Sequence, residues 1–237
     1  GPWKFQPLLN GVEAEWTPDD GTYKLYEKYY REVAGDNIGY RFCYDNLAEG
    51  EQITVQLGVS FVSIENAREN LEAEQKGKDF DAIHAQAVER WNSDLGRITV
   101  EGGTQEQKSI FYTALYHTMI APSEFSDSGG ETQYTTFSLW DTYRAAMPLY
   151  SLFQPDRYHE FISTMLHIYN EQGKLPVWHL HGCETDCMVG SPGIMPVADA
   201  IVAGIADEFE FEAMKASAMN PERGQDYRIQ YGYIPCV

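Results

Sequence analysis

The chain has 237 residues, of which 43% are hydrophobic and 14% aromatic, a composition that predicts a folded globular protein rather than a disordered one. Its 36 acidic residues outnumber its 17 basic residues and give a net charge of −19. Because this charge repels nucleic-acid phosphates and anionic membrane surfaces, no nucleic acid is expected as a partner, and a neutral sugar or a cation is favoured. The sequence contains no run of about 18 apolar residues that could span a membrane.

Strand-like alternation is clearest in two neighbouring segments. Apolar and other residues alternate from Ile38 to Tyr44, and again from Ile53 to Phe61 after a turn at Glu49–Glu51. The pattern predicts two antiparallel strands. Since an isolated hairpin is only marginally stable in water, these strands are expected to be the end of a larger β domain.

Helical periodicity begins at Ile64. A charged stretch ending at Gln75 is followed, after Lys76–Lys78, by apolar residues at spacings of three and four from Phe80 to Trp91. We interpret residues 64–95 as a helical linker, although two ordinary amphipathic surface helices would give the same pattern.

The remainder of the chain predicts helices separated by loops rich in aromatic residues, Gly and Pro. Capping-box pairs are Thr104 with Gln107 and Ser138 with Asp141, the second pair ahead of a helix over 143–153. Pro155 suits the first turn of a helix that ends at Gly173. Further helices are expected at about 195–206 and 208–219.

The loop from Leu175 to Pro196 has the densest group of polar and aromatic side chains. Three interpretations of this loop are open. His179, His181, Cys183, Asp186 and Cys187 could bind zinc, although the spacing lacks paired C-x₂-C motifs. The same side chains could be ordinary packed residues. Alternatively, Glu184 could be a catalytic acid that retains its proton in apolar surroundings beside Trp178.

The cysteines do not indicate whether the protein works in an oxidising or a reducing compartment. Four cysteines are too few for a disulfide framework, and their spacing does not determine their pairing: Cys43, Cys183, Cys187 and Cys236.

Five motifs occur in an order that resembles glycoside hydrolase family 92. They are VSFVSIENAR at 59–68, VEGGT at 100–104, IFYTALYH at 110–117, TFSLWDTYRA at 136–145 and GCETDCMVG at 182–190. The resemblance runs from about residue 50 to the C-terminus. It implies a calcium-dependent exo-α-mannosidase that acts with inversion on terminal mannose.

The family resemblance also implies an architecture. Residues 1–63 would be the C-terminal part of a β-sandwich, 64–95 a helical linker, and 96–237 the first part of an (α/α)₆ barrel. The expected fold class is therefore mixed α and β.

The resemblance assigns roles to six residues. Glu184 would be the general acid that protonates the glycosidic oxygen, and the presence of Glu rather than Gln favours an ordinary glycoside over a mannosyl phosphate. The residues expected to contact mannose are Trp140, Asp141, Arg144, Trp178 and His181.

The second carboxylate that an inverting enzyme needs has no counterpart in the matched motifs. The resemblance places this base and the Ca²⁺ ligands beyond Val237, so the 237 residues are expected to be inactive alone and to pair with the rest of the same enzyme chain. It implies a mannose-containing glycan as substrate and a secreted, periplasmic or cell-surface location. The alternative is a carbohydrate-binding or scaffolding protein on a degenerate hydrolase fold.

Overall fold

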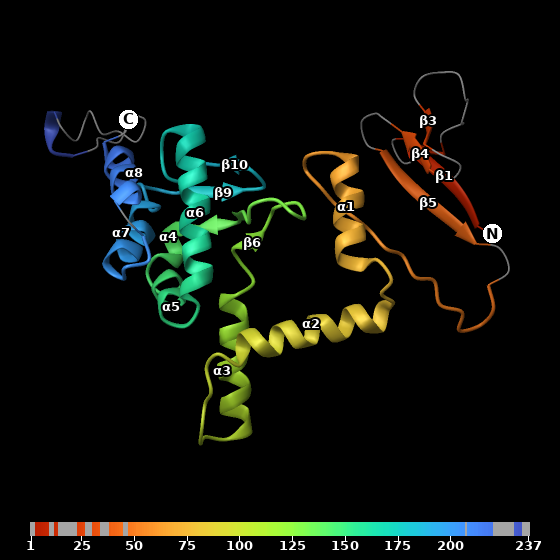
Figure 1. Cartoon of the computed structure of the whole chain (residues 1–237), viewed down its shortest axis with the longest axis horizontal. Helices are drawn as coiled ribbons and strands as arrows, with labels where there is room; N and C mark the ends of the chain where they lie inside the picture. The colour runs from red at the N-terminus through yellow and green to blue at the C-terminus, as the bar shows by residue number, and fades with distance from the viewer. Residues whose placement is uncertain are drawn as a thin grey trace. The chain divides into compact units, whose positions relative to one another are not determined.

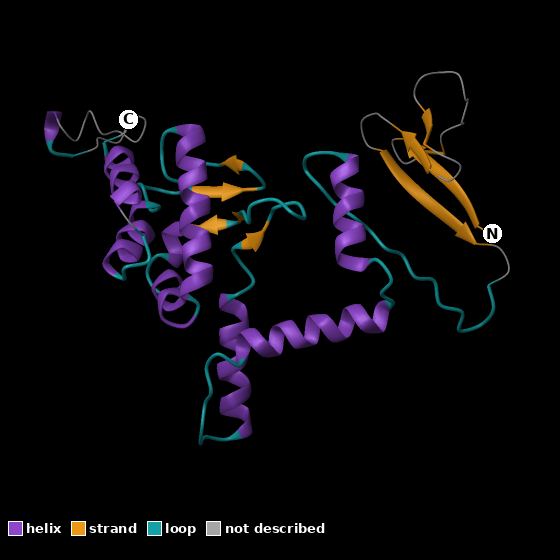
Figure 2. Cartoon of the chain, in the orientation of Figure 1, coloured by secondary structure: helices purple, strands orange, loops and turns teal. Residues whose placement is uncertain are grey.

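The computed structural model describes residues 3–9, 12–13, 23–26, 30–33, 38–44, 47–206, 208–219 and 230–233. The chain divides into two compact units, Gly1–Val55 and Gln56–Val237, and each is described by itself. The described part of the first unit is built from strands, and that of the second is mainly helical with short strands (Figure 2). The expected mixed α and β class is therefore confirmed. The domain limits at 63 and 95 stay a prediction, and Cys236 lies outside the described residues.

The first unit contains strands β1 (Trp3–Leu9), β2 (Val12–Glu13), β3 (Tyr23–Tyr26), β4 (Tyr30–Val33) and β5 (Ile38–Tyr44). Strand β5 is antiparallel to β1 along its whole length, and β2 pairs with the other edge of β1. Strands β3 and β4 form a separate hairpin.

The predicted strand over Ile53–Phe61 is wrong. This segment has no regular secondary structure, and the partner of β5 is β1. Helix α1 (Ile64–Gln75) supplies the physical reason, because the carbonyl oxygens of Leu57 and Val59 accept hydrogen bonds from its Gln75 and Asn70 side chains. Two of its carbonyl groups are thus paired with helix side chains in place of a neighbouring strand.

The second unit begins with α1 and α2 (Phe80–Leu95), which confirms the two helices expected over 64–95. The other helices are α3 (Gln105–Thr118), α4 (Leu139–Thr142), α5 (Ala146–Phe153), α6 (Pro155–Gln172), α7 (Ile194–Val202) and α8 (Glu208–Ala218). The short strands are β6 (Ser123–Glu124), β7 (Tyr134–Thr135), β8 (Phe137–Ser138), β9 (Trp178–Leu180) and β10 (Cys183–Glu184). No helix in the described parts of the chain is long and apolar enough to cross a membrane.

Local capping signals set the ends of several helices. The Thr104 hydroxyl accepts the Gln107 N–H, and the Gln107 side chain accepts the Thr104 N–H, which confirms the predicted capping box of α3. Pro155 begins α6, and Gly173 ends it in the left-handed conformation (φ 76°).

The second predicted capping box is wrong. Ser138 donates its hydroxyl hydrogen to the Asp141 carboxylate (3.0 Å) and caps no backbone N–H. The helix that follows is only the four-residue α4, and the next helix begins at Ala146 rather than Tyr143. The two side chains satisfy each other, so the backbone N–H groups lose the acceptors that a capping box needs.

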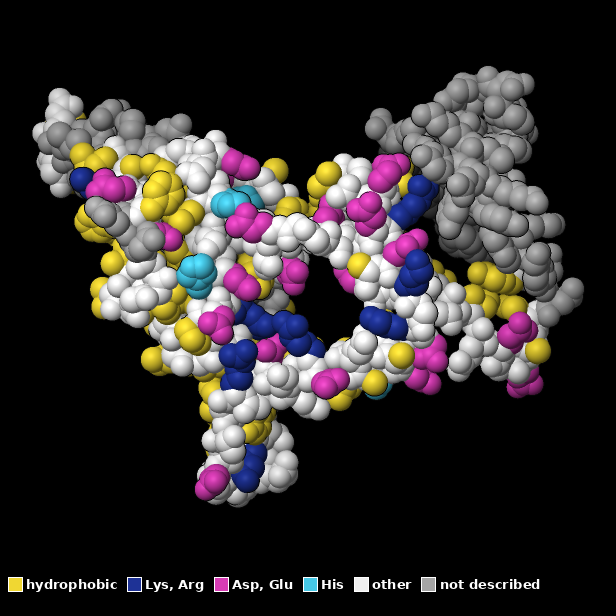
Figure 3. Space-filling model, viewed as in Figure 1, with side chains coloured by type: hydrophobic (Ala, Val, Ile, Leu, Met, Phe, Trp, Pro, Cys, Tyr) yellow, Lys and Arg dark blue, Asp and Glu magenta, His cyan; other side chains and the backbone are white. Residues whose placement is uncertain are grey.

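Helix α6 forms the centre of the core and lies beside β9 in Figure 1. Phe161 is fully buried, and its ring centroid lies 4.7 Å from that of Tyr134, 5.0 Å from that of Tyr150 and 6.1 Å from that of Phe137. The short strands and α5 are thereby packed on one helix. Large apolar side chains also remain exposed on the helical unit (Figure 3), among them Leu152, Val202 and Phe209.

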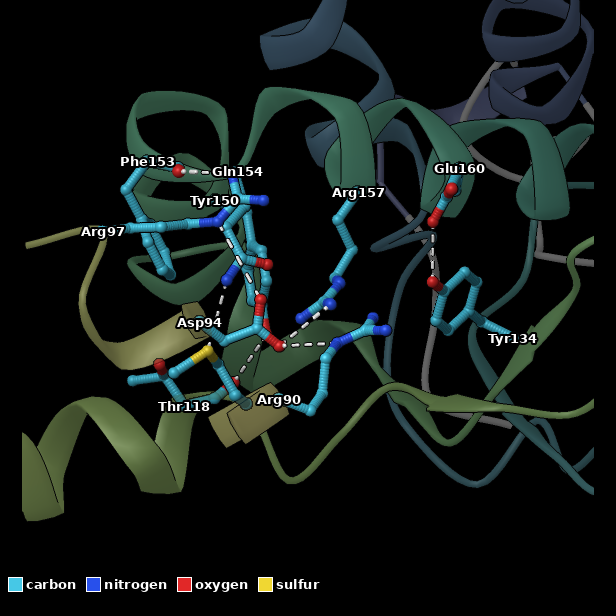
Figure 4. A network of polar contacts seen from close by, with 11 residues as sticks. Arg90, Asp94, Arg97, Thr118, Tyr134, Tyr150, Phe153, Gln154, Arg157 and Glu160 are labelled. Carbon is cyan, nitrogen blue, oxygen red and sulfur yellow. Dashed lines mark hydrogen bonds and ion pairs between the residues drawn. The ribbon is translucent and has the colours of Figure 1, made fainter. Parts of the chain in front are cut away.

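A buried carboxylate connects α2 to α6. Asp94 is 7% exposed and accepts a hydrogen bond from Arg157 of α6 (3.2 Å) and another from Arg90 of α2 (3.3 Å). Arg97 adds an ion pair at 3.9 Å, and its guanidinium donates to the Phe153 carbonyl. Figure 4 shows the three guanidinium groups around this carboxylate. We call Asp94 with Arg90, Arg97 and Arg157 the Asp94 clamp.

Candidate active site

A three-stranded sheet brings two of the sequence motifs together. Its strand order is β10, β9, β8, with β9 in the centre and both pairings antiparallel. His179 of β9 lies opposite Glu184 on one side and Phe137 on the other. The sheet therefore joins the strand that carries the predicted acid, through β9, to the strand that leads into Trp140 and Asp141.

The Glu184 carboxylate is held by the main chain of its own hairpin. Oε2 accepts the Val177 N–H (2.7 Å), while Oε1 accepts the N–H groups of Trp178 and Asp186 (both 2.9 Å). A carboxylate offers about two acceptor positions on each oxygen. Both positions of Oε1 are therefore used, and Oε2 keeps one that no main-chain donor of the described residues occupies. The side chain is partly exposed, so a ligand can reach it.

Three residues other than glycine adopt left-handed backbone conformations around this hairpin: Thr136 (φ 67°), His181 (φ 48°) and Asp186 (φ 48°). Such angles are uncommon outside glycine and carry a conformational cost, most of all for the β-branched Thr136. Long-range hydrogen bonds hold two of them in place. The Thr136 N–H donates to the His179 carbonyl, and the His181 N–H donates to the Thr135 hydroxyl (2.7 Å).

His179 is buried behind Glu184. Burial lowers the pKa of its imidazole, against the smaller opposing effect of the Glu184 charge. Its Nδ1 atom has no hydrogen-bond partner among the described residues. The lowered pKa favours the neutral imidazole at this position of β9.

Trp140 forms an aromatic surface near the end of the loop that carries Glu184. The Arg144 guanidinium lies 4.8 Å from the ring centre of Trp140 and 4.8 Å from that of Tyr143. The Trp140 ring also lies 4.0 Å from the position that a Cβ on Gly190 would occupy. The end of the Glu184 loop thus returns to Trp140, and Arg144 is oriented by two aromatic faces.

The other predicted contact residues are accessible. Asp141 and His181 are exposed, and Trp178 is partly buried. His181 extends the site toward two phenylalanines, because its ring centroid lies 5.9 Å from that of Phe61 and 6.1 Å from that of Phe125.

The geometry disfavours a metal centre built from the loop. Among the described residues, no group of three or more His, Cys, Asp and Glu side chains converges closely enough to bind a metal ion. Cys183 and Cys187 are free thiols, and Asp186 forms an ion pair with Lys174 (2.9 Å). The zinc interpretation is therefore not supported, and the Ca²⁺ site stays a prediction.

The sequence that forms this site matches a known family profile. Residues 66–237 match the profile of the glycosyl hydrolase family 92 catalytic domain. The chain belongs to this family.

Solved structures of family 92 enzymes are similar to the chain. One is a family GH92 α-mannosidase from Bacteroides thetaiotaomicron, with 27% sequence identity and a TM-score of 0.79 over 98% of this chain and 33% of that one. Another is a family GH92 inverting mannosidase from the same bacterium, with 32% identity and a TM-score of 0.66 over 74% of this chain and 27% of that one.

A curated relative, an uncharacterized secreted glycosidase from Arthroderma benhamiae, is 27% identical over 165 residues. That match covers 68% of this chain and 19% of the relative. The chain thus spans about a fifth of this curated relative and about a third of the solved α-mannosidase.

Sequence reasoning missed the main-chain part of this family 92 site. The N–H groups that hold Glu184 belong to Val177, Trp178 and Asp186, and backbone donors leave no residue-type signal. It also missed the contact of Phe61 with Phe125, 64 positions along the chain, because local periodicity carries no information about such a distant pair.

Proposed function

We propose that the chain contributes the acid side of a glycoside hydrolase that removes terminal α-linked mannose with inversion. The arrangement around Glu184 is the observation that carries the proposal: three main-chain N–H groups fix the carboxyl and leave one acceptor position on Oε2. A proton at that position is the one that Glu184 would donate to the glycosidic oxygen. Family membership and the solved mannosidases support the substrate class.

Residues around the sheet would bind the terminal mannose. Trp140 offers an aromatic face to the C–H side of a sugar ring, and Asp141 offers a carboxylate to its hydroxyl groups. Arg144 would hold the Trp140 ring in place, while Trp178 and His181 would border the same position. Inversion also needs a carboxylate base about 6.5–9.5 Å from the acid, and we assign no residue to that role.

Calcium dependence, an (α/α)₆ barrel preceded by a β-sandwich, and a secreted, periplasmic or cell-surface location complete the proposal. Family resemblance supports the first two, and the description of the Arthroderma benhamiae relative as secreted supports the third. The described residues contain no cluster of three or more His, Cys, Asp and Glu side chains, and we assign no Ca²⁺ ligands among them.

Replacing Glu184 with Gln in the complete gene product tests the proposal. The amide keeps the shape of the side chain but cannot donate an acidic proton, so turnover of an alkyl α-mannoside is expected to fall by about 10²–10⁴-fold. A mannoside with a good leaving group, such as dinitrophenolate, needs little protonation and should lose much less.

Glu106→Gln, an exposed substitution in the first turn of α3, is the matched control and should leave both rates unchanged. Equal losses on the two substrates, or no loss on either, would show that Glu184 is not the acid. A protein with sugar affinity and no turnover would favour the carbohydrate-binding alternative.

A further inference from the structure

The helical unit contains a cavity whose walls include Phe61 and Phe125, the two rings beside His181 of the Glu184 hairpin. It has a volume of about 270 Å³ and is formed by the segment 57–61, by α1 and by the loop that follows β6. Figure 1 shows that loop extending from β6 toward α1. Pockets for drug-sized ligands hold about 300–1,000 Å³, so this cavity fits a single small ring rather than a long chain.

The walls of the cavity are acidic, which determines the charge of the ligand that can bind there. Glu74, Glu124 and Asp127 line it, and the part of the chain that the structure describes contributes no Lys, Arg or His to its walls. The Asp127 carboxylate accepts hydrogen bonds from Asn70 (2.8 Å), Ser60 (2.9 Å) and Asn66 (2.9 Å), and that from Asn70 is the largest cause of its lowered pKa. An anionic ligand is therefore repelled, while a neutral ligand that donates hydroxyl hydrogens is favoured.

The same hydrogen-bond network holds the walls of the cavity together. Asn70 is buried, donates to both the Val59 carbonyl and Asp127, and accepts the Ser128 N–H (2.7 Å). One side chain thus connects the segment 57–61 with the loop after β6. Asp127 is occupied in holding these walls, whereas Glu74 and Glu124 are exposed and available to a ligand.

An aromatic surface completes the cavity. Phe61 is 66% exposed, and its ring centroid lies 4.5 Å from that of Phe125, with both residues in the cavity wall. Aromatic faces bind the apolar C–H surface of a sugar, while carboxylates accept its hydroxyl hydrogens. Phe125 also contacts His181, so this cavity adjoins the candidate active site.

We propose that this cavity is an additional carbohydrate subsite, in which one neutral sugar unit of the glycan stacks on Phe61 and Phe125 and donates hydrogen bonds to Glu74 and Glu124. The choice of a sugar rests on the proposed function. The geometry distinguishes this subsite from the position beside Trp140, which would bind the terminal mannose.

The test is a titration of the 237-residue chain with mannobiose, followed by isothermal calorimetry and by NMR of the phenylalanine and tryptophan rings. Phe61→Ala removes a mostly exposed ring, and it is expected to weaken mannobiose binding about two- to tenfold. Phe80→Ala is the matched control, because Phe80 is 70% exposed on α2 and lies outside the cavity; it should have no effect. Glu124→Gln should weaken binding about two- to tenfold, whereas Glu69→Gln on the exposed surface of α1 should not.

The possible outcomes test the subsite independently of the proposed reaction. Ligand-induced shifts of the Phe61 and Phe125 rings in the wild type, with the shift of the Phe125 ring reduced in Phe61→Ala, support the subsite, even if Glu184→Gln leaves turnover intact. Shifts confined to Trp140 and Trp178, or equal binding by Phe61→Ala and the wild type, overturn the subsite and leave the proposed reaction standing. Failure of mannobiose to bind at all also overturns it, while the Glu184→Gln rates still decide the reaction.

Discussion

His179 is a buried residue of the candidate site, and its burial changes the pKa of its imidazole. Because burial lowers its pKa below the ordinary value of 6.5, the folded chain binds this proton less readily than the unfolded chain does. The contribution to stability is therefore fully present above pH 6.5 and is lost as the pH falls below it. His179 is the cross-strand partner of Glu184, so its burial belongs to the hairpin that holds this carboxylate.

Replacement of His179 by Gln is expected to remove that pH dependence. The quantity to measure is the free energy of unfolding in urea at pH 7.5 and pH 5.5. Its decrease between the two pH values should be smaller for His179→Gln than for the wild type. His84→Gln, on the exposed surface of α2, serves as the control and should retain the wild-type decrease. An unchanged decrease in His179→Gln would mean that other groups carry the acid sensitivity.

At the scale of elements, the Asp94 clamp connects α2 to α6 through one nearly buried carboxylate. The ion pair between Glu72 and Lys76 is shorter, at 2.9 Å, yet both of its side chains are about two-thirds exposed or more. Arg157 is only 20% exposed and lies 3.2 Å from Asp94. Burial rather than distance should decide which pair stabilises the fold, because water screens the exposed one.

Asp94→Ala is therefore expected to lower the free energy of unfolding by about 3 kcal/mol, since it leaves the Arg157 guanidinium without its carboxylate. Glu72→Ala should lower it by less than about 1 kcal/mol. Urea denaturation of the two variants makes the comparison. Similar losses in both would mean that the clamp behaves as an ordinary surface ion pair.

Elements with signals inside their own sequence could be predicted. Pro155 and Gly173 mark the ends of α6 because each restricts or permits a particular backbone angle at its own position. The segment from Ile53 to Phe61 alternates like a strand, but pairing needs a partner that no local pattern reveals. Ser138 and Asp141 have capping-box spacing, yet their mutual hydrogen bond replaces the cap.

In the candidate site, too, side chains with a local sequence signal could be predicted, whereas contacts between distant parts of the chain could not. Glu184, Trp140 and Asp141 could be proposed because catalytic and sugar-binding roles require particular side chains and because the motifs around them resemble those of the family, and their roles stay predictions. The Asp94 clamp and the Asn70–Asp127 contact join positions 63 and 57 residues apart. Such contacts arise from tertiary packing, which a single sequence does not record.

For the molecule as a whole, the helical unit Gln56–Val237 carries the site, and its core supports the site through α6. Tyr134 and Phe137 of the short strands both contact Phe161, and Tyr150 of α5 joins them. The strands are only two or three residues long, so their own hydrogen bonds cannot hold them in place. Packing on Phe161 is what positions the sheet that presents Glu184.

Phe161→Ala is accordingly expected to lower the free energy of unfolding by about 3–5 kcal/mol, through lost burial and the cavity left behind. Single domains have a total of about 5–15 kcal/mol, so this one ring would account for a large fraction. Leu152→Ala, at an 81% exposed position on α5, should change it by less than about 0.5 kcal/mol. Phe161→Leu refills most of the volume and should recover part of the loss. If Phe161→Ala unfolds at the same urea concentration as Leu152→Ala, the sheet is held by contacts other than those of α6.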